Sequence, residues 1–487
     1  MKPTRRDVLA LGGGAVASVF FTPVPWKLLD DASIWTQNWP WIPQPVKGPV
    51  EWKESACALC PAVCALRVKM AGGYAVGLSG KDGALCALGY GAHQMNWHPQ
   101  RLTVVLHNGQ PSTWEAAEAA FQKACADGPV AIIDGRPGRG SSQVYRKFAE
   151  KTPGALYAVV RTPEEEALRP LAALVGVPVE QLGYDLENTK LVLSISAPLL
   201  EGWDGPQRVQ RLWPAMQIIQ AETELSRTGI CASRRVQIKP GSEAMLAIAL
   251  AHVLLDEKLA TGPRPATSLA EAATLAGVEI EEVKGLARTL AAERPSVVIS
   301  ARPEPAVAAL NVLLGAVGAK GGIVAQSGAP EAAKSMDELP GTLRAALLDS
   351  TVPWDRKPAG VQEVFRFAAW RGGDEQGWLL PAPGFLEEAT DNPGTGSRAE
   401  ALLKPPAGVK TAVAFLGGEL PAAKLVESAI VPLTCKLAAW PASAPDWQNN
   451  WSSGWTAAWT PAVLAPLATK LNQESKLMPA GGGRRQA

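Results

Sequence analysis

The chain has few residues of the kinds that build hydrolytic or haem sites. It contains only four histidines in 487 residues, and neither a His-Glu-x-x-His nor a Cys-x-x-Cys-His pattern occurs. His93, His98, His107 and His252 form no recognisable set with a serine and an aspartate. These absences exclude a zinc protease of the His-Glu-x-x-His type and a covalently attached haem of the usual c type.

The chain also lacks an excess of either positive or negative charge, and it lacks a second long apolar run. The 47 basic and 46 acidic residues leave a formal net charge of +1, which gives no electrostatic reason to bind nucleic acid. Beyond residue 26, no stretch is long and apolar enough to span a bilayer. We therefore expect a globular protein of about three domains, without a nucleic-acid partner.

Cysteine is rare, yet four of the seven cysteines fall within a window of thirty residues. Cys57, Cys60 and Cys64 lie close together, and Cys86 follows after twenty-one residues. Three near ligands and one distant ligand are typical of a [4Fe–4S] cluster. A zinc site or two disulfides are the alternatives, although zinc prefers paired cysteines or added histidines. The other three cysteines are isolated and are expected to be packing residues: Cys125, Cys231 and Cys435.

The N-terminus has the features of an export signal. Arg5 and Arg6 precede a modest apolar run, which is the pattern of a twin-arginine (Tat) signal. Residues 8–26 form an uncharged run of nineteen residues, just long enough to cross a bilayer core. Cleavage at residues 15–17 would leave a very short apolar region, so an uncleaved anchor is the alternative. The sequence predicts Tat export to the periplasmic face of the cytoplasmic membrane.

Tryptophan is frequent and unevenly placed. Of the 17 tryptophans, five lie between residues 26 and 52, and five lie between residues 440 and 459. Both segments are also rich in Pro, Asn, Gln and Ser. Tryptophan is enriched at protein and membrane interfaces, where one end of the side chain contacts apolar groups and the other contacts water. We therefore expect these two segments to contact a partner protein or a membrane. The alternative is that these rings fill gaps in the chain's own core.

The middle of the chain alternates between strand-like and helix-like segments. Short apolar runs predict strands at 130–135, 191–196, 216–221, 235–238 and 296–300. Longer periodic segments predict helices at 141–151, 243–255 and 283–293, the second of them capped by Ser242. The glycine-rich loop at 135–142 matches neither the Rossmann nor the P-loop spacing and is predicted to be a structural turn. This alternation is typical of parallel sheets covered by helices.

Six segments, taken in order, resemble the molybdopterin oxidoreductase superfamily, which includes formate dehydrogenases and periplasmic nitrate reductases. Each segment is weak alone, but their shared order makes the resemblance strong over most of residues 50–400. They are the cysteine block and the segments 96–102, 112–117, 236–243, 310–322 and 379–387.

Three departures from the family pattern bear on function. Family enzymes usually carry a lysine two residues after the fourth cysteine, where this chain has Leu88, and leucine supplies neither charge nor hydrogen bond. No Ser, Cys or Asp occurs in a recognisable molybdenum-ligand context after the cysteine block. The C-terminal barrel domain is expected to be missing, because about a hundred residues remain after Leu380 and they carry none of its motifs. The resemblance therefore implies a scaffold that keeps the cluster and has no molybdenum or molybdopterin site.

Segments 26–41 and 197–203 resemble one branch more closely, the molybdopterin-like subunits of menaquinone reductase and alternative complex III-type complexes. The resemblance implies an α/β fold with a small N-terminal iron–sulfur domain, in which Cys57, Cys60, Cys64 and Cys86 hold one [4Fe–4S] cluster. It also implies three partners: a multihaem cytochrome c subunit, a ferredoxin-like iron–sulfur subunit and a quinone-binding integral membrane subunit. Such a chain transfers electrons between periplasmic cytochromes and menaquinone and has no substrate site of its own.

Two other functions stay open at this point. One is the catalytic subunit of a molybdenum or tungsten oxidoreductase resembling formate dehydrogenase, with its barrel supplied by another chain. The other is an assembly scaffold without redox activity. The expected domains are a signal and Trp-rich linker at 1–48, a cluster domain at 50–110, a discontinuous α/β domain at 111–165 with 283–400, an inserted α/β domain at 166–282, and a Trp-rich tail at 401–487.

Overall fold

The computed structural model describes residues 4–21, 48–60, 63–81, 83–203, 205–326, 333–373, 375–392 and 397–419. The chain forms two compact units, Met1–Trp52 with Lys69–Val76, and Lys53–Val68 with Gly77–Ala487. Cys435 and all but one of the tryptophans in the two expected clusters lie outside the described residues. The exception is Trp52. The part of the chain in which a C-terminal barrel would be sought also lies largely outside them.

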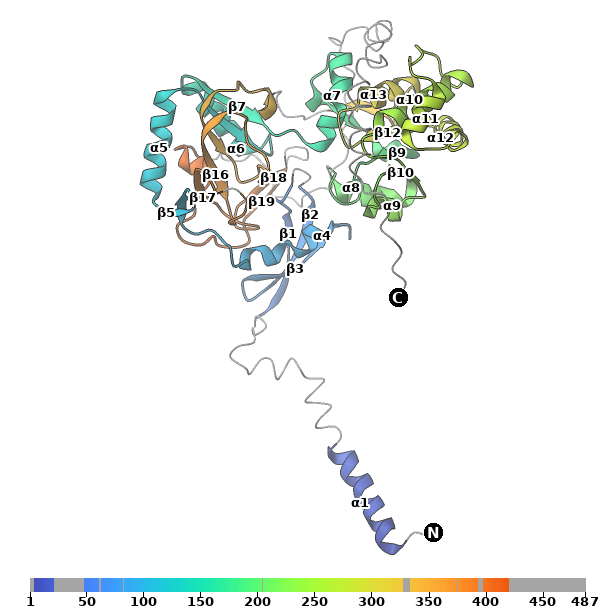
Figure 1. The fold of residues 1–487 in the computed structure, drawn as a ribbon. Coiled ribbons are helices and arrows are strands. Elements are labelled where there is room, and N and C mark those ends of the chain that lie inside the picture. The colour runs from blue at the N-terminus through green and yellow to red at the C-terminus, as the bar shows by residue number, and fades with distance from the viewer. Residues whose placement is uncertain are drawn as a thin grey trace, which may run out of the picture. The chain divides into compact units, whose positions relative to one another are not determined.

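The first unit contains helix α1 (Arg5–Phe21), drawn in dark blue in Figure 1. At its start, the main-chain N–H of Thr4 donates to the Asp7 carboxylate at 2.8 Å, which supports the first turn. α1 has 17 residues, and residues 22–26 of the expected apolar run lie outside the described residues. Among the described helices, α1 included, none combines the length and apolar character needed to cross a membrane.

A three-stranded sheet carries the cysteine block. Its order is β1 (Val50–Ala56), β2 (Ala65–Ala71) and β3 (Tyr74–Gly80). The short helix α4 (Ala87–Gly91) and the 3-10 helix η1 (Ala92–Trp97) follow.

The larger α/β domain is built on an eight-stranded sheet with the order β14-β7-β6-β15-β16-β17-β4-β5. Neighbours from β14 to β17 pair in parallel, whereas β4 pairs antiparallel with β17 and β5. The strands are β4 (Val105–His107), β5 (Gln110–Ser112), β6 (Val130–Asp134), β7 (Ala155–Val159), β14 (Lys334–Ser335), β15 (Leu343–Leu348), β16 (Val361–Ala368) and β17 (Trp378–Pro381).

Both faces of this sheet are covered, which is why β6 is apolar on both sides. Val130 and Ile132 pack with α5 (Trp114–Asp127), α6 (Gly140–Lys151) and α14 (Ala412–Phe415), while Ala131 and Ile133 pack in a second cluster on the opposite face. A strand buried on both faces is a continuous apolar run rather than an alternating one. The strand predicted at 130–135 and the helix predicted at 141–151 are confirmed.

The second α/β domain has a fully parallel four-stranded sheet of order β11-β10-β9-β12. Figure 1 shows helices α10 to α13 gathered beside it. The strands are β9 (Leu191–Ile195), β10 (Gln217–Glu222), β11 (Arg234–Gln237) and β12 (Ser296–Ser300). The helices are α7 (Pro163–Val175), α8 (Pro206–Leu212), α9 (Arg227–Cys231), α10 (Glu243–Asp256), α11 (Leu269–Ala276), α12 (Ile280–Ala292) and α13 (Pro305–Leu313).

The predicted strands and helices of this domain are confirmed to within a few residues, with one correction at Ser242. This residue precedes α10, but its hydroxyl donates to the Lys239 carbonyl at 2.7 Å instead of accepting a helix N–H. β12 pairs with β9 along all five residues, so the four-stranded sheet continues past residue 282, where the inserted domain is expected to end. The expected domain limits stay a proposal.

The remaining elements are short and connect the larger ones. β8 pairs antiparallel with β13, and β18 pairs antiparallel with β19. They are β8 (Leu182–Tyr184), β13 (Ile323–Ala325), β18 (Thr390–Asn392), β19 (Ser397–Ala399), η2 (Val179–Gln181), η3 (Leu186–Asn188), η4 (Trp213–Ala215) and η5 (Met336–Glu338).

Candidate metal centre

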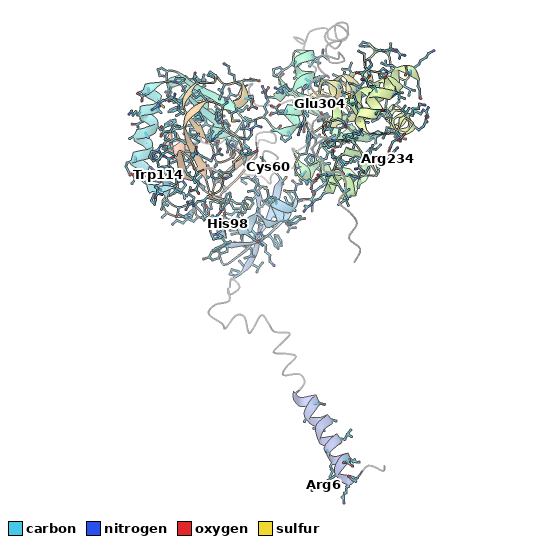
Figure 2. All side chains as sticks on the ribbon, in the orientation of Figure 1. Arg6, Cys60, His98, Trp114, Arg234 and Glu304 are labelled. Atoms are coloured by element: carbon cyan, nitrogen blue, oxygen red, sulfur yellow. The ribbon has the colours of Figure 1, made fainter. Side chains whose placement is uncertain are left out.

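The three clustered cysteines lie on the connection between β1 and β2. Cys57 follows the last residue of β1, and Cys64 precedes the first residue of β2. The N–H of Cys57 donates to the Cys64 carbonyl at 2.8 Å, which closes the loop and brings its two ends together. Cys60 lies within this loop, where Figure 2 labels it. The adjacent residues 61 and 62 lie outside the described residues.

The fourth cysteine begins a helix. Cys86 occupies the N-cap position of α4, and its sulfur accepts the N–H of Gly89 at 3.3 Å. An N-cap side chain normally accepts such a bond through oxygen. Here the Cys86 sulfur accepts a hydrogen bond from a main-chain N–H. Such a bond stabilises the thiolate, which is the form of cysteine that binds iron.

The structure forms no disulfide among these four described cysteines. Cys57 and Cys64 are buried, with 4% and 6% of their surface exposed. Burial raises the pKa of the Cys57 thiol strongly and that of Cys64 to about 12. Charge on Cys60 or Cys86 raises both pKa values further, which shows that the four sulfurs share one electrostatic neighbourhood. A cationic metal centre would reverse this effect, because coordinated thiols are deprotonated.

Main-chain N–H groups also act on the two buried sulfurs. Main-chain hydrogen bonds from Leu59 to Cys57 and from Gln207 to Cys64 lower the pKa of each thiol. Burial raises the pKa by more, so the net shift is upward. Hydrogen bonds to the sulfurs are among the features that set the reduction potential of an iron–sulfur cluster. Four cysteine thiols supplied with N–H donors therefore fit a [4Fe–4S] cluster in the chemistry of the donor set.

Throughout the described ranges, no group of three or more His, Cys, Asp or Glu side chains, the four cysteines included, is placed to hold a metal ion. Cys125 and Cys231, each partly buried, pack against the apolar cores of the two α/β domains. Among the histidines, His107 stacks on Trp378 with 4.2 Å between ring centroids, and His252 contacts the Thr267 carbonyl.

A cavity of about 360 Å³ adjoins the cysteine loop. Ala58 and Leu59 line it together with Leu88, the residue found where the family usually has lysine. The rest of its lining includes residues that follow the carboxyl ends of β6, β15, β16 and β17: Arg136, Thr351, Trp370 and Phe385. Open α/β sheets bind ligands at this end of their strands.

A buried arginine links the cysteine loop to the larger α/β domain beside this cavity. Arg136, which is 4% exposed, donates from Nη1 to the Ala58 carbonyl at 3.1 Å. Arg139 bridges the carboxylates of Asp134 and Asp349 at 2.9 and 2.6 Å. The Asp349 pKa is lowered against burial, because Arg139 stabilises the carboxylate.

The start of α6 is already occupied by a carboxylate. The glycine-rich loop at 135–142 leads into this helix, and the N–H of Gly140 donates to Asp391 Oδ2 at 3.0 Å. The N-terminus of a helix is where a strand–loop–helix unit would hold a phosphate. With Asp391 placed there and Arg139 held by two aspartates, this region as arranged does not fit the phosphate of a nucleotide-bearing cofactor. That this loop is a structural turn stays a prediction.

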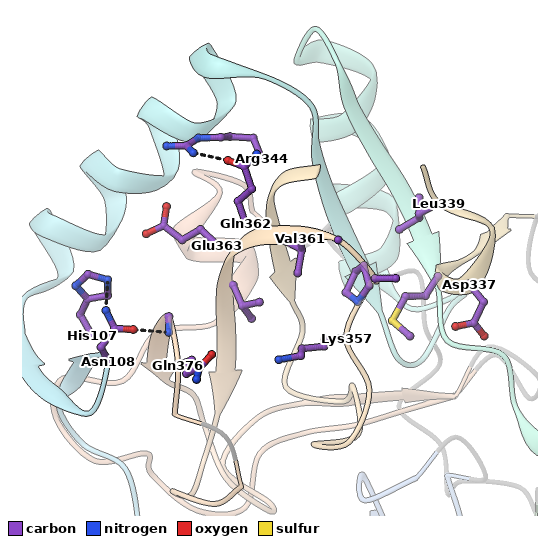
Figure 3. A pocket seen from close by; sticks show the side chains of 16 residues that line it. His107, Asn108, Asp337, Leu339, Arg344, Lys357, Val361, Gln362, Glu363 and Gln376 are labelled. Atoms are coloured by element: carbon purple, nitrogen blue, oxygen red, sulfur yellow. Dashed lines mark hydrogen bonds between the residues drawn. The ribbon is translucent and has the colours of Figure 1, made fainter. Parts of the chain in front are cut away.

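A larger pocket of about 680 Å³ lies at the other end of the same sheet (Figure 3). Its lining includes His107, Lys357 and Glu363 and the starts of β15 and β16. Arg344 donates to Gln362 at 2.6 Å across its upper wall. This pocket is at the amino ends of the parallel strands, away from the end at which such sheets bind ligands, and we assign it no role.

Sequence reasoning found the four cysteines and Leu88 but missed Arg136, Gln207 and Asp391. The glycine-rich loop that contains Arg136 gave a partial signal. Gln207 and Asp391 had no local signal, because their partners lie 142 and 251 residues away in the chain.

No protein-family model matches the chain. Over 361 residues it is 29% identical to the menaquinone reductase, molybdopterin-binding-like subunit, of Nitratidesulfovibrio vulgaris (strain Hildenborough), covering 66% of this chain. The chain spans about half the length of that relative, 52%. Among solved structures, acetylene hydratase from Pelobacter acetylenicus matches with a TM-score of 0.56 and 12% identity, over 75% of this chain and 68% of that chain. The chain is therefore similar in sequence to a menaquinone reductase molybdopterin-binding-like subunit, and its α/β fold is similar to that of acetylene hydratase. The α/β fold with parallel sheets that the six ordered segments predicted is confirmed.

Proposed function

We propose that the chain is an iron–sulfur electron-transfer and scaffold subunit of a membrane-associated menaquinone oxidoreductase complex. The observation that carries this proposal is the set of four cysteines, Cys57, Cys60, Cys64 and Cys86, whose thiols act on one another electrostatically and are supplied with N–H donors. When bound, a [4Fe–4S] cluster accepts and returns single electrons. The name of the curated relative supports the menaquinone assignment.

The chain's own residues serve this role by holding and shielding the sulfurs. The loop between β1 and β2 and the first turn of α4 present the thiols, and burial of Cys57 and Cys64 keeps water from them. Arg136 places a buried positive charge beside the loop. Exclusion of water and a fixed nearby charge are both factors that set a cluster's potential.

The proposal includes the absence of a molybdenum site in this chain. Its support is Leu88 at the usual lysine position, the carboxylate of Asp391 at the start of α6, and the engagement of Arg139 by Asp134 and Asp349. An enzyme that held a pterin dinucleotide in this region would need free donors for its phosphates.

The proposed partners are a multihaem cytochrome c subunit, a ferredoxin-like iron–sulfur subunit and a quinone-binding integral membrane subunit. The proposed location is the periplasmic face of the cytoplasmic membrane after Tat export. Their support is the twin arginine at Arg5 and Arg6 and the similarity to a menaquinone reductase subunit.

The test is metal analysis of the purified full chain or its complex, for iron, molybdenum and tungsten together, with EPR of the reduced sample. We expect about four irons per chain, a [4Fe–4S] signal, and neither molybdenum nor tungsten. Cys60→Ala should abolish the iron signal, whereas the matched control Cys125→Ala should keep it. Stoichiometric molybdenum or tungsten would make this chain a catalytic subunit instead, and a chain without iron that still joins a complex would be a redox-inactive scaffold.

A further inference from the structure

One glutamine from the second α/β domain contacts the backbone beside two of the four cysteines. Gln207 is the second residue of α8 and is 3% exposed. Its Oε1 accepts the N–H of Ala65 at 3.0 Å, and its Nε2 donates to the carbonyls of Ala65 and Ala84 at 3.0 and 2.9 Å. Both amide hydrogens and the carbonyl oxygen of the side chain are therefore used.

The two alanines are placed where their positions fix two sulfurs. Ala65 directly follows Cys64, and Ala84 is two residues before Cys86. Because the same Nε2 donates to both carbonyls, the side chain fixes the spacing between the loop that carries three cysteines and the segment that carries the fourth. Residues that orient metal ligands without touching the metal are nearly as important to a site as the ligands.

α8 is itself held firmly, so that the clamp is rigid. Arg208, the next residue, is 4% exposed and donates from Nη2 to the Tyr184 carbonyl and from Nε to Glu187, both at 2.8 Å. A ligand is held to better than about 0.5 Å only when the residue that orients it is locked by its own neighbours.

We propose that Gln207 is the positioning residue that sets the spacing of Cys64 and Cys86, and that the second α/β domain holds the iron–sulfur site together through it. The role in iron retention rests on the proposed function. The spacing of the two thiols does not depend on it, and the experiment separates the two.

The test compares Gln207→Leu with Gln210→Leu in the full chain. Both remove a side-chain amide from α8, but only the first removes the bonds to Ala65 and Ala84. The first readout needs no iron: iodoacetamide labelling of metal-free protein, followed by mass spectrometry at Cys64 and at Cys125. We expect at least a tenfold faster reaction of Cys64 in Gln207→Leu, with Cys125 unchanged, and wild-type rates in Gln210→Leu.

The second readout follows the iron-loaded protein. Gln207→Leu should release iron to a chelator at least tenfold faster than wild type and shift the cluster's EPR signal, while Gln210→Leu should do neither. Gln207→Glu should behave like Gln207→Leu, because a carboxylate has no donor for the two carbonyls.

Equal Cys64 labelling in wild type and Gln207→Leu overturns the positioning role, whatever the iron content. Faster labelling of Cys64 and Cys125 alike shows general unfolding, which also overturns it. Faster labelling of Cys64 alone supports the role, and if wild type then holds no iron, it is the proposed function that fails.

Discussion

Arg136 Nη1 donates to the carbonyl oxygen of Ala58 at 3.1 Å, inside the loop between Cys57 and Cys60. Burial lowers the pKa of this arginine to about 10, so it is still charged at neutral pH. Leu88, which stands where the resemblance to molybdopterin oxidoreductases leads one to expect a lysine, lines the same cavity. Arg136 thus brings a positive charge to the cysteine loop from the larger α/β domain.

A buried cation favours the more negative, reduced form of a neighbouring redox centre. We expect Arg136→Met to lower the midpoint potential of the cluster by about 60 mV, equivalent to a tenfold shift of a one-electron equilibrium. An EPR-monitored redox titration measures this. The matched control is Arg169→Met, since Arg169 is exposed on α7 and pairs with Glu166 on the same helix. A potential that stays the same in Arg136→Met, with iron retained, would contradict this role.

Arg101 and Glu387 form a buried ion pair that joins two of the family-like segments. Their side chains are 9% and 6% exposed, and Arg101 also donates to the carbonyls of Ala369 and Ala382. Breaking a buried pair leaves an uncompensated charge and costs about 3–5 kcal/mol. Glu387→Gln should therefore lower the free energy of unfolding by about 3 kcal/mol, measured by urea denaturation.

Glu375→Gln is the control for this pair. It removes a partly exposed partner of Arg371 and should cost less than about 1 kcal/mol. Equal losses in the two variants would argue against the buried pair.

Asp391 stabilises the start of α6. Its carboxylate accepts the N–H of Gly140, and loss of such a cap typically costs about 1 kcal/mol. Asp391→Ala should speed hydrogen exchange at Gly140 and the next amides of α6, with little change in β6. The exposed Asp355 offers the control Asp355→Ala, which should leave these amides unchanged. Unaltered exchange in Asp391→Ala would mean that the carboxylate is not needed there.

Glu388 gives stability a pH dependence. Burial raises the pKa of Glu388 to about 7. The negative charges of Asp349 and Asp391 also raise this pKa, whereas the positive charges of Arg139 and Arg136 lower it. The folded protein thus holds a proton that the unfolded chain has lost above its ordinary pKa of 4.5. The contribution of Glu388 to the free energy of unfolding is constant below about pH 4.5 and falls as the pH rises from there to about 7. Above about pH 7 it is constant again, and the total loss is at most about 3 kcal/mol.

Glu388→Gln removes this titration. The variant should match wild type near pH 4, where both side chains are neutral, and exceed it in stability at pH 8. Urea denaturation at pH 4 to 8 measures the difference between the two proteins, which cancels the contributions of other groups such as Glu304. A difference that does not grow with pH would show that Glu388 ionises freely in the folded state.

Local sequence determined the elements with strong local signals. The apolar runs 130–135 and 296–300 are too short for helices and are bounded by turn residues, so they could only be strands. The spacing of Cys57, Cys60, Cys64 and Cys86 by itself indicates one shared site, because three near ligands and a distant fourth are typical of a cluster. Order and spacing of motifs were enough to predict the family-like α/β fold.

The tertiary structure alone decided which distant residues meet. β15 lies between β6 and β16, and this places Asp349 beside Asp134 although 215 residues separate them in the sequence. In the same way, the packing of α8 brings Gln207 to Ala65 and Ala84, and the segment at β18 brings Asp391 to Gly140. Strand order is fixed by burial of both sheet faces rather than by any local preference. The local sequence around a polar side chain therefore does not indicate which distant backbone group it will hydrogen-bond to in the folded protein.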